Sequence, residues 1–163
     1  NIPPIVTRGI VLDMAGQAST DVMAEGTLIT VEDLQGALDT TGLTLAEGDV
    51  VLLHTGWLDL IGSEPDRFAA GEPGIDGAGA AWLAEQGVVA VGADTWGLDA
   101  VPHPDGLVFP AHQELLAKNG VYILENMATG QLVEDGVTEF MFVLGQPRFE
   151  GAVQSMINPV AIR

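Results

Sequence analysis

The sequence predicts an α/β fold in which a layered, mostly parallel or mixed β-sheet is flanked by helices. Short apolar runs rich in β-branched residues recur along the chain, and segments with helical periodicity separate them. With 163 residues, 47% of them hydrophobic, the chain has enough apolar material for a core of its own. We therefore expect one domain over residues 1–163, with any functional site at the ends of the strands.

The first half of the chain supplies two strands and a helix to this prediction. Residues 10–12 form a short apolar run, and residues 49–54 form a second one that ends at His54. Between them, Thr30 followed three positions later by Asp33 is typical of a helix start, and Gly42 ends that helix. Residues 61–79 are glycine, proline and acidic residues with little periodicity, which predicts an exposed excursion.

The second half repeats the alternation of helices and strands. Helices are predicted at 80–84 and 111–118, and strands at 88–92, 121–124, 139–144 and 160–162. The segment 94–109 lacks periodicity, and loops of this length are often functional. Pro110 suits the first turn of the helix that follows this loop.

Composition excludes several classes of function. Five Lys and Arg against 23 Asp and Glu give a net charge of −18, which repels the phosphates of nucleic acids and anionic membranes. The longest apolar run, 88–93, is far shorter than the roughly 20 residues of a membrane-spanning helix. Because the sequence has no cysteine, any metal site must use His, carboxylate and water.

The N-terminal residues have neither a basic region nor an apolar signal segment, which predicts a cytoplasmic protein. The chain begins at Asn1 and not at Met, so we expect that an upstream segment of the same protein is missing from this sequence.

His112 and Glu125 are the first candidates for a metal site. His112 lies in the first turn of a predicted helix, and Glu125 follows the apolar run 121–124. A carboxylate at the end of a buried strand needs a cation, a metal or several hydrogen-bond donors. The spacing alone leaves two interpretations open, a metal pair or a surface histidine with a hydrogen-bonded glutamate.

Three further side chains follow predicted strands. His54 could face a substrate or be a hydrogen-bonded structural residue. Trp57 and Trp96 could form the wall of a pocket for a flat apolar substrate, or could simply pack within their loops.

The order of several segments resembles the second half of proteins of the cyclase family, which includes bacterial kynurenine formamidase and isatin hydrolase. These segments are 6–13, 48–57 with Thr55-Gly56-Trp57, 91–95 with Asp94-Thr95, 109–116, 122–126 and 158–162. The resemblance implies a swivelling β/β/α architecture of mixed sheets with helices, of which residues 1–163 are the C-terminal portion.

The resemblance also implies a metal-dependent hydrolase that cleaves the amide or lactam C–N bond of a small, aromatic substrate. His112 and Glu125 match metal ligands of the family, for which zinc and manganese are the expected ions. Trp57, Asp94, Thr95, Trp96 and His54 are the expected substrate-binding residues, although relatives often have Arg in place of His54.

The main metal motif of the family, His-x-Gly-Thr-His-x-Asp, does not occur in this sequence. The histidine that transfers protons in the family lies upstream with it, so the catalytic residues stay unknown and this chain alone should be inactive. Family members often form homo-oligomers, and we expect the same here. The alternatives are an inactive member that serves as a binding or assembly module and, with little support beyond charge, an unrelated acidic binding protein.

Overall fold

The structure is a computed structural model that describes residues 3–163. The strands are β1 (Ile5–Asp13), β2 (Leu28–Ile29), β3 (Val50–His54), β4 (Gly74–Ile75), β5 (Ala90–Ala93), β6 (Tyr122–Leu124), β7 (Glu139–Leu144) and β8 (Val160–Ile162). The α-helices are α1 (Met14–Gln17), α2 (Val31–Thr41), α3 (Leu60–Ser63), α4 (Pro65–Ala70), α5 (Gly77–Glu85), α6 (Pro110–His112) and α7 (Gly130–Glu134). A 3₁₀ turn, η1 (Trp57–Asp59), precedes α3, and a π-helix, η2 (Gln113–Asn119), continues α6.

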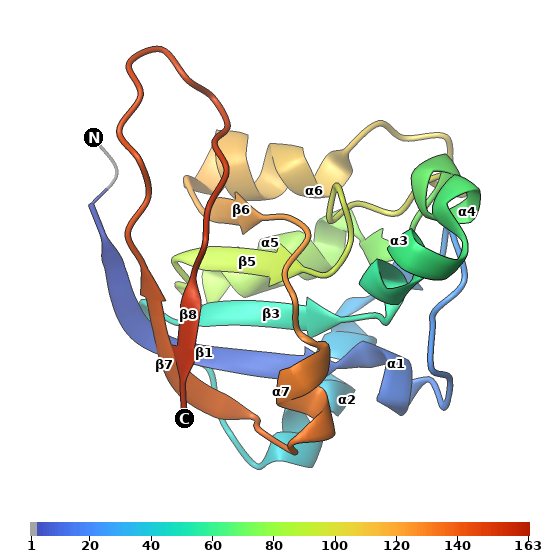
Figure 1. Ribbon diagram of the computed structural model, residues 1–163, viewed down its shortest axis with the longest axis horizontal. Coiled ribbons are helices and arrows are strands. Elements are labelled where there is room, and N and C mark those ends of the chain that lie inside the picture. The colour runs from blue at the N-terminus through green and yellow to red at the C-terminus, as the bar shows by residue number, and fades with distance from the viewer. Residues whose placement is uncertain (1–2) are drawn as a thin grey trace.

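A six-stranded mixed sheet in the order β6-β5-β3-β1-β7-β8 organises the molecule (Figure 1). The four strands β6, β5, β3 and β1 are parallel, whereas β7 runs antiparallel to β1, and β8 antiparallel to β7. Strands β2 and β4 form a separate two-stranded parallel sheet. The prediction of an α/β fold with a mixed sheet and flanking helices is confirmed.

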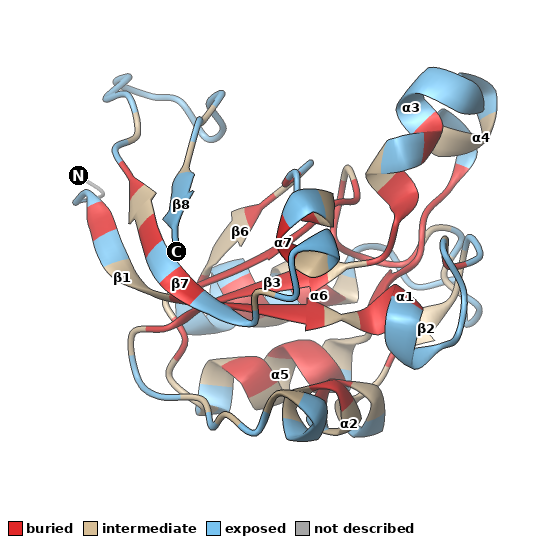
Figure 2. Ribbon diagram, turned by 60° about the horizontal axis from the view of Figure 1, so that its bottom comes forward, coloured by how far each residue is buried: buried red, intermediate tan, exposed pale blue. Residues whose placement is uncertain are grey.

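The parallel strands are buried on both faces because helices cover one side and β7 and α7 contribute to the other. Figure 2 shows α2 and α5 together on one side of the sheet and α7 on the opposite side. Within β3, Val51 and Leu53 belong to the core under α2 and α5, and Val50 and Leu52 belong to the core under α7. Alternate side chains of a strand point to opposite faces, so one apolar run serves both cores.

Helix α2 begins and ends where the sequence predicts. Thr30 and Asp33 form a reciprocal capping box, in which the Thr30 hydroxyl accepts from the Asp33 amide and the Asp33 carboxylate accepts from the Thr30 amide. Gly42 ends the helix in the left-handed conformation, with φ of 69°, that glycine adopts without steric strain.

The prediction of an exposed excursion over 61–79 is wrong for its second part. Helices α3 and α4 do lie at the surface, but residues 71–75 are buried. Their backbone pairs with the loop after β5, at the bridges Glu72–Val101 and Ile75–Asp99, and with β2 through β4. Periodicity did not reveal this because two-residue strands and single bridges are too short to leave a pattern, which also explains why α7 and β2 were not predicted.

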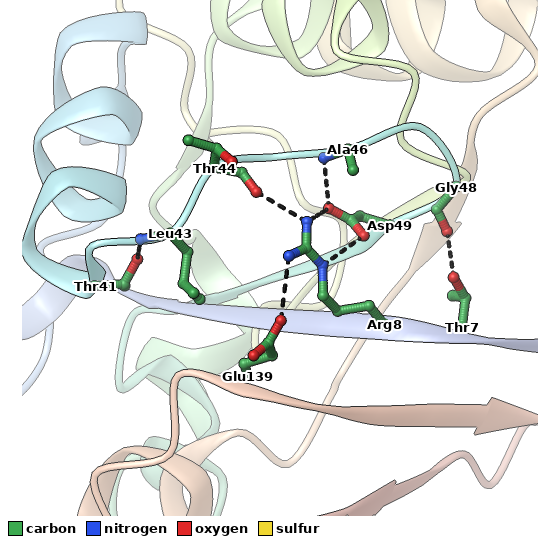
Figure 3. A network of polar contacts seen from close by, with 9 residues as sticks. All are labelled: Thr7, Arg8, Thr41, Leu43, Thr44, Ala46, Gly48, Asp49 and Glu139. Carbon is green, nitrogen blue, oxygen red and sulfur yellow. Dashed lines mark hydrogen bonds and ion pairs between the residues drawn. The ribbon is translucent and has the colours of Figure 1, made fainter.

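A partly buried ion pair joins β1 to the start of β3 (Figure 3). The Arg8 guanidinium donates to both carboxylate oxygens of Asp49, at 2.9 and 2.6 Å. It also donates to the Thr44 carbonyl at 2.8 Å and to Glu139 of β7 at 3.2 Å. One planar side chain therefore links β1, the loop before β3 and β7, and the bidentate geometry is one that only arginine provides.

Replacing Arg8 with Lys should destabilise the chain by about 2–3 kcal/mol, because the buried Asp49 would lose one of its two charged hydrogen bonds and the link to Glu139 would be lost with it. Urea denaturation measures this loss. Arg67→Lys is the matched control, because the ion-pair partners of Arg67, Glu25 and Glu64, are exposed and lie 3.5 Å away. Lysine can keep the cation–π contact that Arg67 makes with the Trp57 ring, so this variant should change stability by less than about 0.5 kcal/mol. Equal losses in the two variants would show that the Arg8 geometry is unimportant.

Candidate active site

The carboxyl ends of the parallel strands carry a row of ionisable side chains. Asp13 is the last residue of β1 and His54 the last of β3, while Asp94 directly follows β5 and Glu125 directly follows β6. Because these strands are parallel neighbours, the four side chains come to the same edge of the sheet. This edge is where open α/β sheets bind ligands.

Asp94 holds the turn that follows β3. Its carboxylate is 1% exposed and accepts hydrogen bonds from the Thr55 amide at 2.9 Å, the Thr55 hydroxyl at 2.6 Å and the Gly56 amide at 2.8 Å. Gly56 has a φ of 76°, and a Cβ on it would collide with the Asp21 carbonyl oxygen at 2.0 Å. Asp94 and Gly56 together therefore fix the path of the chain at the end of β3.

His54 is hydrogen-bonded on the side that faces α7. Its Nδ1 lies 2.9 Å from the Thr129 hydroxyl and 3.3 Å from the Asp94 carboxylate. Burial alone would lower the pKa of His54, but the hydrogen bond and charge of Asp94, with smaller effects from Asp13 and Asp59, outweigh it and raise the pKa.

The structure brings His112 and Glu125 together. His112 Nε2 lies 3.7 Å from Glu125 Oε1, and His112 Nδ1 lies 2.6 Å from the carboxylate of Asp99. Asp99 also accepts from the Ala111 amide at 2.6 Å and the His112 amide at 3.2 Å, so it fixes the start of the helix and the histidine ring at once. The hydrogen bonds to Asp99 and then Glu125 raise the pKa of His112 to about 9.

Sequence reasoning missed two carboxylates near this pair, Asp99 and Glu72. Asp99 lies between Leu98 and Ala100 in the long loop, and a lone acidic residue among apolar ones is the signal that could have identified it. Glu72 comes from the segment that was predicted to be exposed. Its Oε2 accepts from the Trp96 amide at 2.6 Å, and its buried Oε1 has no hydrogen-bond partner.

Glu72 is fully buried, and burial raises its pKa to about 8. The charges of Glu125 and Asp99 act in the same direction, while the backbone amides of Trp96 and Gly97 partly oppose it. Glu72, Asp99 and Glu125 therefore belong to one electrostatic neighbourhood around His112.

Two of the predicted substrate-binding residues, Trp57 and Trp96, donate hydrogen bonds to the same carbonyl group. The indole Nε1 of Trp57 lies 3.4 Å from the Phe68 carbonyl oxygen, and that of Trp96 lies 2.9 Å from it. Trp57 is 0% exposed, so its ring is not accessible to a substrate in this structure. Thr95 is also buried, and its carbonyl accepts from the Asn126 amide at 2.8 Å.

Across residues 3–163, no group of three or more His, Asp and Glu side chains is arranged to hold a metal ion. His112 and Glu125 nevertheless fit half of a coordination shell. The ring of His112 is oriented through Nδ1 by a carboxylate, which leaves Nε2 facing Glu125, and this is the arrangement by which proteins orient a metal-binding histidine.

In the part of the chain that the structure describes, no helix is long and apolar enough to cross a membrane.

The comparison with family models decides the family. Residues 1–100 match the model Cyclase, described as "Putative cyclase". The chain belongs to the cyclase family.

Solved structures agree with this cyclase assignment. A crystal structure described as a novel cyclase is 30% identical to this chain, with a TM-score of 0.85 over 97% of this chain and 54% of that one. Isatin hydrolase A from Ralstonia solanacearum is 24% identical, with a TM-score of 0.78 over 98% of this chain and 61% of that one. An isatin hydrolase bound to the product analogue thioisatinate is 20% identical, with a TM-score of 0.76 over 96% of this chain and 60% of that one.

The cyclase chain therefore spans little more than half the length of these similar structures. No curated protein matches it at the level of sequence. The comparisons show the cyclase family and its fold, and they do not show the reaction or the substrate.

Glu72→Gln should stabilise this cyclase chain increasingly as the pH rises. The pKa of Glu72 is about 8 in the folded protein and 4.5 ordinarily. The wild type therefore has its full unfolding free energy below pH 4.5, and it loses the contribution of the protonated Glu72 as the pH rises through 8. Gln keeps the shape of the protonated form, so the gain in unfolding free energy should reach about 2–4 kcal/mol by pH 8.

Urea denaturation between pH 5 and pH 9 provides the measurement. Glu85→Gln, at an exposed position of α5, is the matched control and should follow the wild type throughout. A difference between Glu72→Gln and the wild type that does not change with pH would show that Glu72 is ionised in the folded protein.

Proposed function

We propose that this cyclase-family chain is part of a metal-dependent hydrolase that cleaves the C–N bond of an amide or lactam, with a small aromatic compound as substrate. The observation that carries the proposal is the pairing of His112 Nε2 with Glu125, while Asp99 holds Nδ1. The similar structures that are named isatin hydrolases support it, and another at 19% identity is described as a potential metal-dependent hydrolase with cyclase activity.

In this proposal His112 and Glu125 hold a divalent metal, zinc or manganese, from one side. Histidine nitrogen and carboxylate oxygen suit both ions. When bound, such an ion supplies a Lewis acid for the substrate carbonyl and a water of lowered pKa. With an ion bound, Asp99 would hold the proton of the neutral His112 ring on Nδ1 and leave Nε2 to the ion, and further ligands would come from outside this chain's described residues.

The row of side chains at the sheet edge accounts for substrate binding in this proposal. His54 carries a raised pKa and lies beside Asp94, so it can donate a proton or a hydrogen bond to a polar group of the substrate. Asp94 and Thr95 act through the loops that they hold, because both are buried. Trp57 and Trp96 form the apolar backing of this row of side chains, and both donate a hydrogen bond to the Phe68 carbonyl.

We also propose a homo-oligomer, and a small molecule as the binding partner. The alternative function is an inactive cyclase-fold module for binding or assembly, and the specific observation in its favour is the absence of a three-ligand metal group among residues 3–163. Metal content separates the two proposals.

In the full-length gene product, we expect about one divalent ion per protomer that depends on His112 and Glu125, because the pair supplies two of its ligands. His112→Ala and Glu125→Ala should each lower metal content by at least about tenfold after dialysis, as measured by inductively coupled plasma mass spectrometry. His103→Ala is the control, since that histidine lies in the long loop and its Nδ1 accepts from the Asp105 amide. Full metal content in both site variants would contradict the assignment of the ligands.

Catalysis is tested separately with the metal-loaded protein. We expect hydrolysis of an N-formyl arylamine or of isatin, and an Asp99→Asn variant should lower kcat by about 10–100-fold because the His112 ring would lose its charged partner. The release of formate or of the ring-opened acid measures the rate. Stoichiometric metal together with no hydrolysis of either compound would favour the binding module.

A further inference from the structure

Phe109 occupies a position that local structure would assign to a different residue. It is the N-terminal cap of the helix that begins with α6, and its φ of 48° and ψ of 55° are left-handed. Cap positions favour Asn, Asp, Ser, Thr or Gly, whose small or polar side chains suit the exposed helix amides, and Phe makes no such bond here. A bulky residue with positive φ is also sterically disfavoured, whereas Asn tolerates this conformation.

The helix does not depend on Phe109 for its cap. Asp99 accepts hydrogen bonds from the Ala111 and His112 amides, so a carboxylate from the loop after β5 satisfies the groups that a cap residue would bind. Nothing in the backbone therefore requires an aromatic residue at this position. Strained residues that local rules do not explain concentrate at functional sites.

The ring of Phe109 lies against the proposed metal ligand. Its centroid is 5.3 Å from that of the His112 ring, at an angle of 58°. Gly97 also lies near the ring, since an added Cβ on it would be 3.7 Å from Phe109 and 2.8 Å from Glu72 Oε1. A side chain on Gly97 would thus fill the space beside the ring and collide with the carboxyl group.

Unlike Trp57, Phe109 is an exposed residue, with 37% of its surface accessible to solvent. Leu107 and Val108 precede it and are exposed as well, at 55% and 78%. Three consecutive exposed apolar residues are unusual on a protein surface unless they serve a function. Phe109 therefore offers exposed aromatic surface next to His112, which the buried Trp57 does not.

We propose that Phe109 is the specificity-determining wall of the substrate site and packs its ring against the flat aromatic part of a substrate held beside His112. This inference rests on the proposed hydrolase function. An aromatic partner in offset or tilted contact gains more than its buried area alone provides, which gives aromatic substrates an advantage over aliphatic ones.

Phe109→Asn tests the proposal because it improves the local structure while removing the ring. In the full-length, metal-loaded protein we expect the melting temperature to stay equal or rise. For formanilide, an aromatic formamide, KM should rise by about tenfold or more with kcat changed by less than about threefold. For N-butylformamide, an aliphatic counterpart, kcat/KM should stay within about twofold, because this substrate gains nothing specific from the ring.

Two variants serve as controls for Phe109→Asn. Phe109→Tyr keeps the ring and should restore the KM for formanilide to within about threefold of the wild type. Phe149→Asn makes the same substitution at a phenylalanine that is 67% exposed in the β7–β8 connection, and it should leave both substrates unaffected. A lower melting temperature with equal losses for both substrates would overturn the proposal, since Phe109 would then be a packing residue. An unchanged KM for formanilide would overturn it as well.

Failure of the proposed function would be recognised independently of this test. If the metal-loaded wild type hydrolyses neither formamide, the reaction class is wrong, and the role of Phe109 is then read from equilibrium binding of 2-aminobenzoate by fluorescence, with butyrate as an aliphatic competitor. Binding by the wild type that is lost in Phe109→Asn and kept in Phe109→Tyr supports the aromatic wall. No binding by the wild type, or equal binding by all three proteins, overturns it.

Discussion

The geometry of the candidate site depends on the buried carboxylate of Asp94. Its three hydrogen bonds to Thr55 and Gly56 join the chain after β5 to the chain after β3, which are neighbouring parallel strands. This buried carboxylate accepts hydrogen bonds from two backbone amides and a hydroxyl. Its hydrogen-bonding capacity is therefore used within the protein, and its position is fixed. Because His54 directly precedes this turn and contacts Asp94 through Nδ1, one carboxylate sets the position of the turn and the histidine. The sheet supplies the edge, and Asp94 makes that edge rigid enough to carry a site.

A second carboxylate, Asp99, plays the same part on the other side of the site. It orients the His112 ring, and it caps the helix that carries His112 from a loop that is remote in sequence. The loop is in turn held by the buried segment 71–75 through the Glu72–Val101 and Ile75–Asp99 bridges. The position of His112 therefore depends on contacts across three separate parts of the chain. Since the loop supplies the cap, the residue at the cap position itself is free to serve another purpose, which is the physical reason that Phe109 can occupy it.

The sequence was sufficient for what depends on local pattern. The apolar runs at β1, β3, β5 and β7 and the capping box of α2 each carry their signal within a few residues, so the mixed α/β sheet could be predicted. His112 and Glu125 could be proposed because a helix start and a strand end have recognisable signatures. Glu72 could not, because its burial results from two isolated bridges with residues more than twenty positions away. Trp57 and Trp96 could be located in loops, but their common attachment to the Phe68 carbonyl is a tertiary contact with no local signal.

The charge balance of the chain explains why the pKa of both histidines of the site is raised. Of its five Lys and Arg residues, Arg8 pairs with Asp49 and Glu139, Arg67 with Glu25 and Glu64, Lys118 with Glu114, and Arg163 with Asp135. Across residues 3–163, every ion pair of Asp94, Asp99 and Glu125 is made with a histidine. In a chain of net charge −18, these carboxylates raise the pKa of His54 and His112 because the protonated imidazole is the counter-charge within reach. A divalent cation between His112 and Glu125 would neutralise these carboxylates with twice the charge of the protonated imidazole, and it would displace the proton on Nε2.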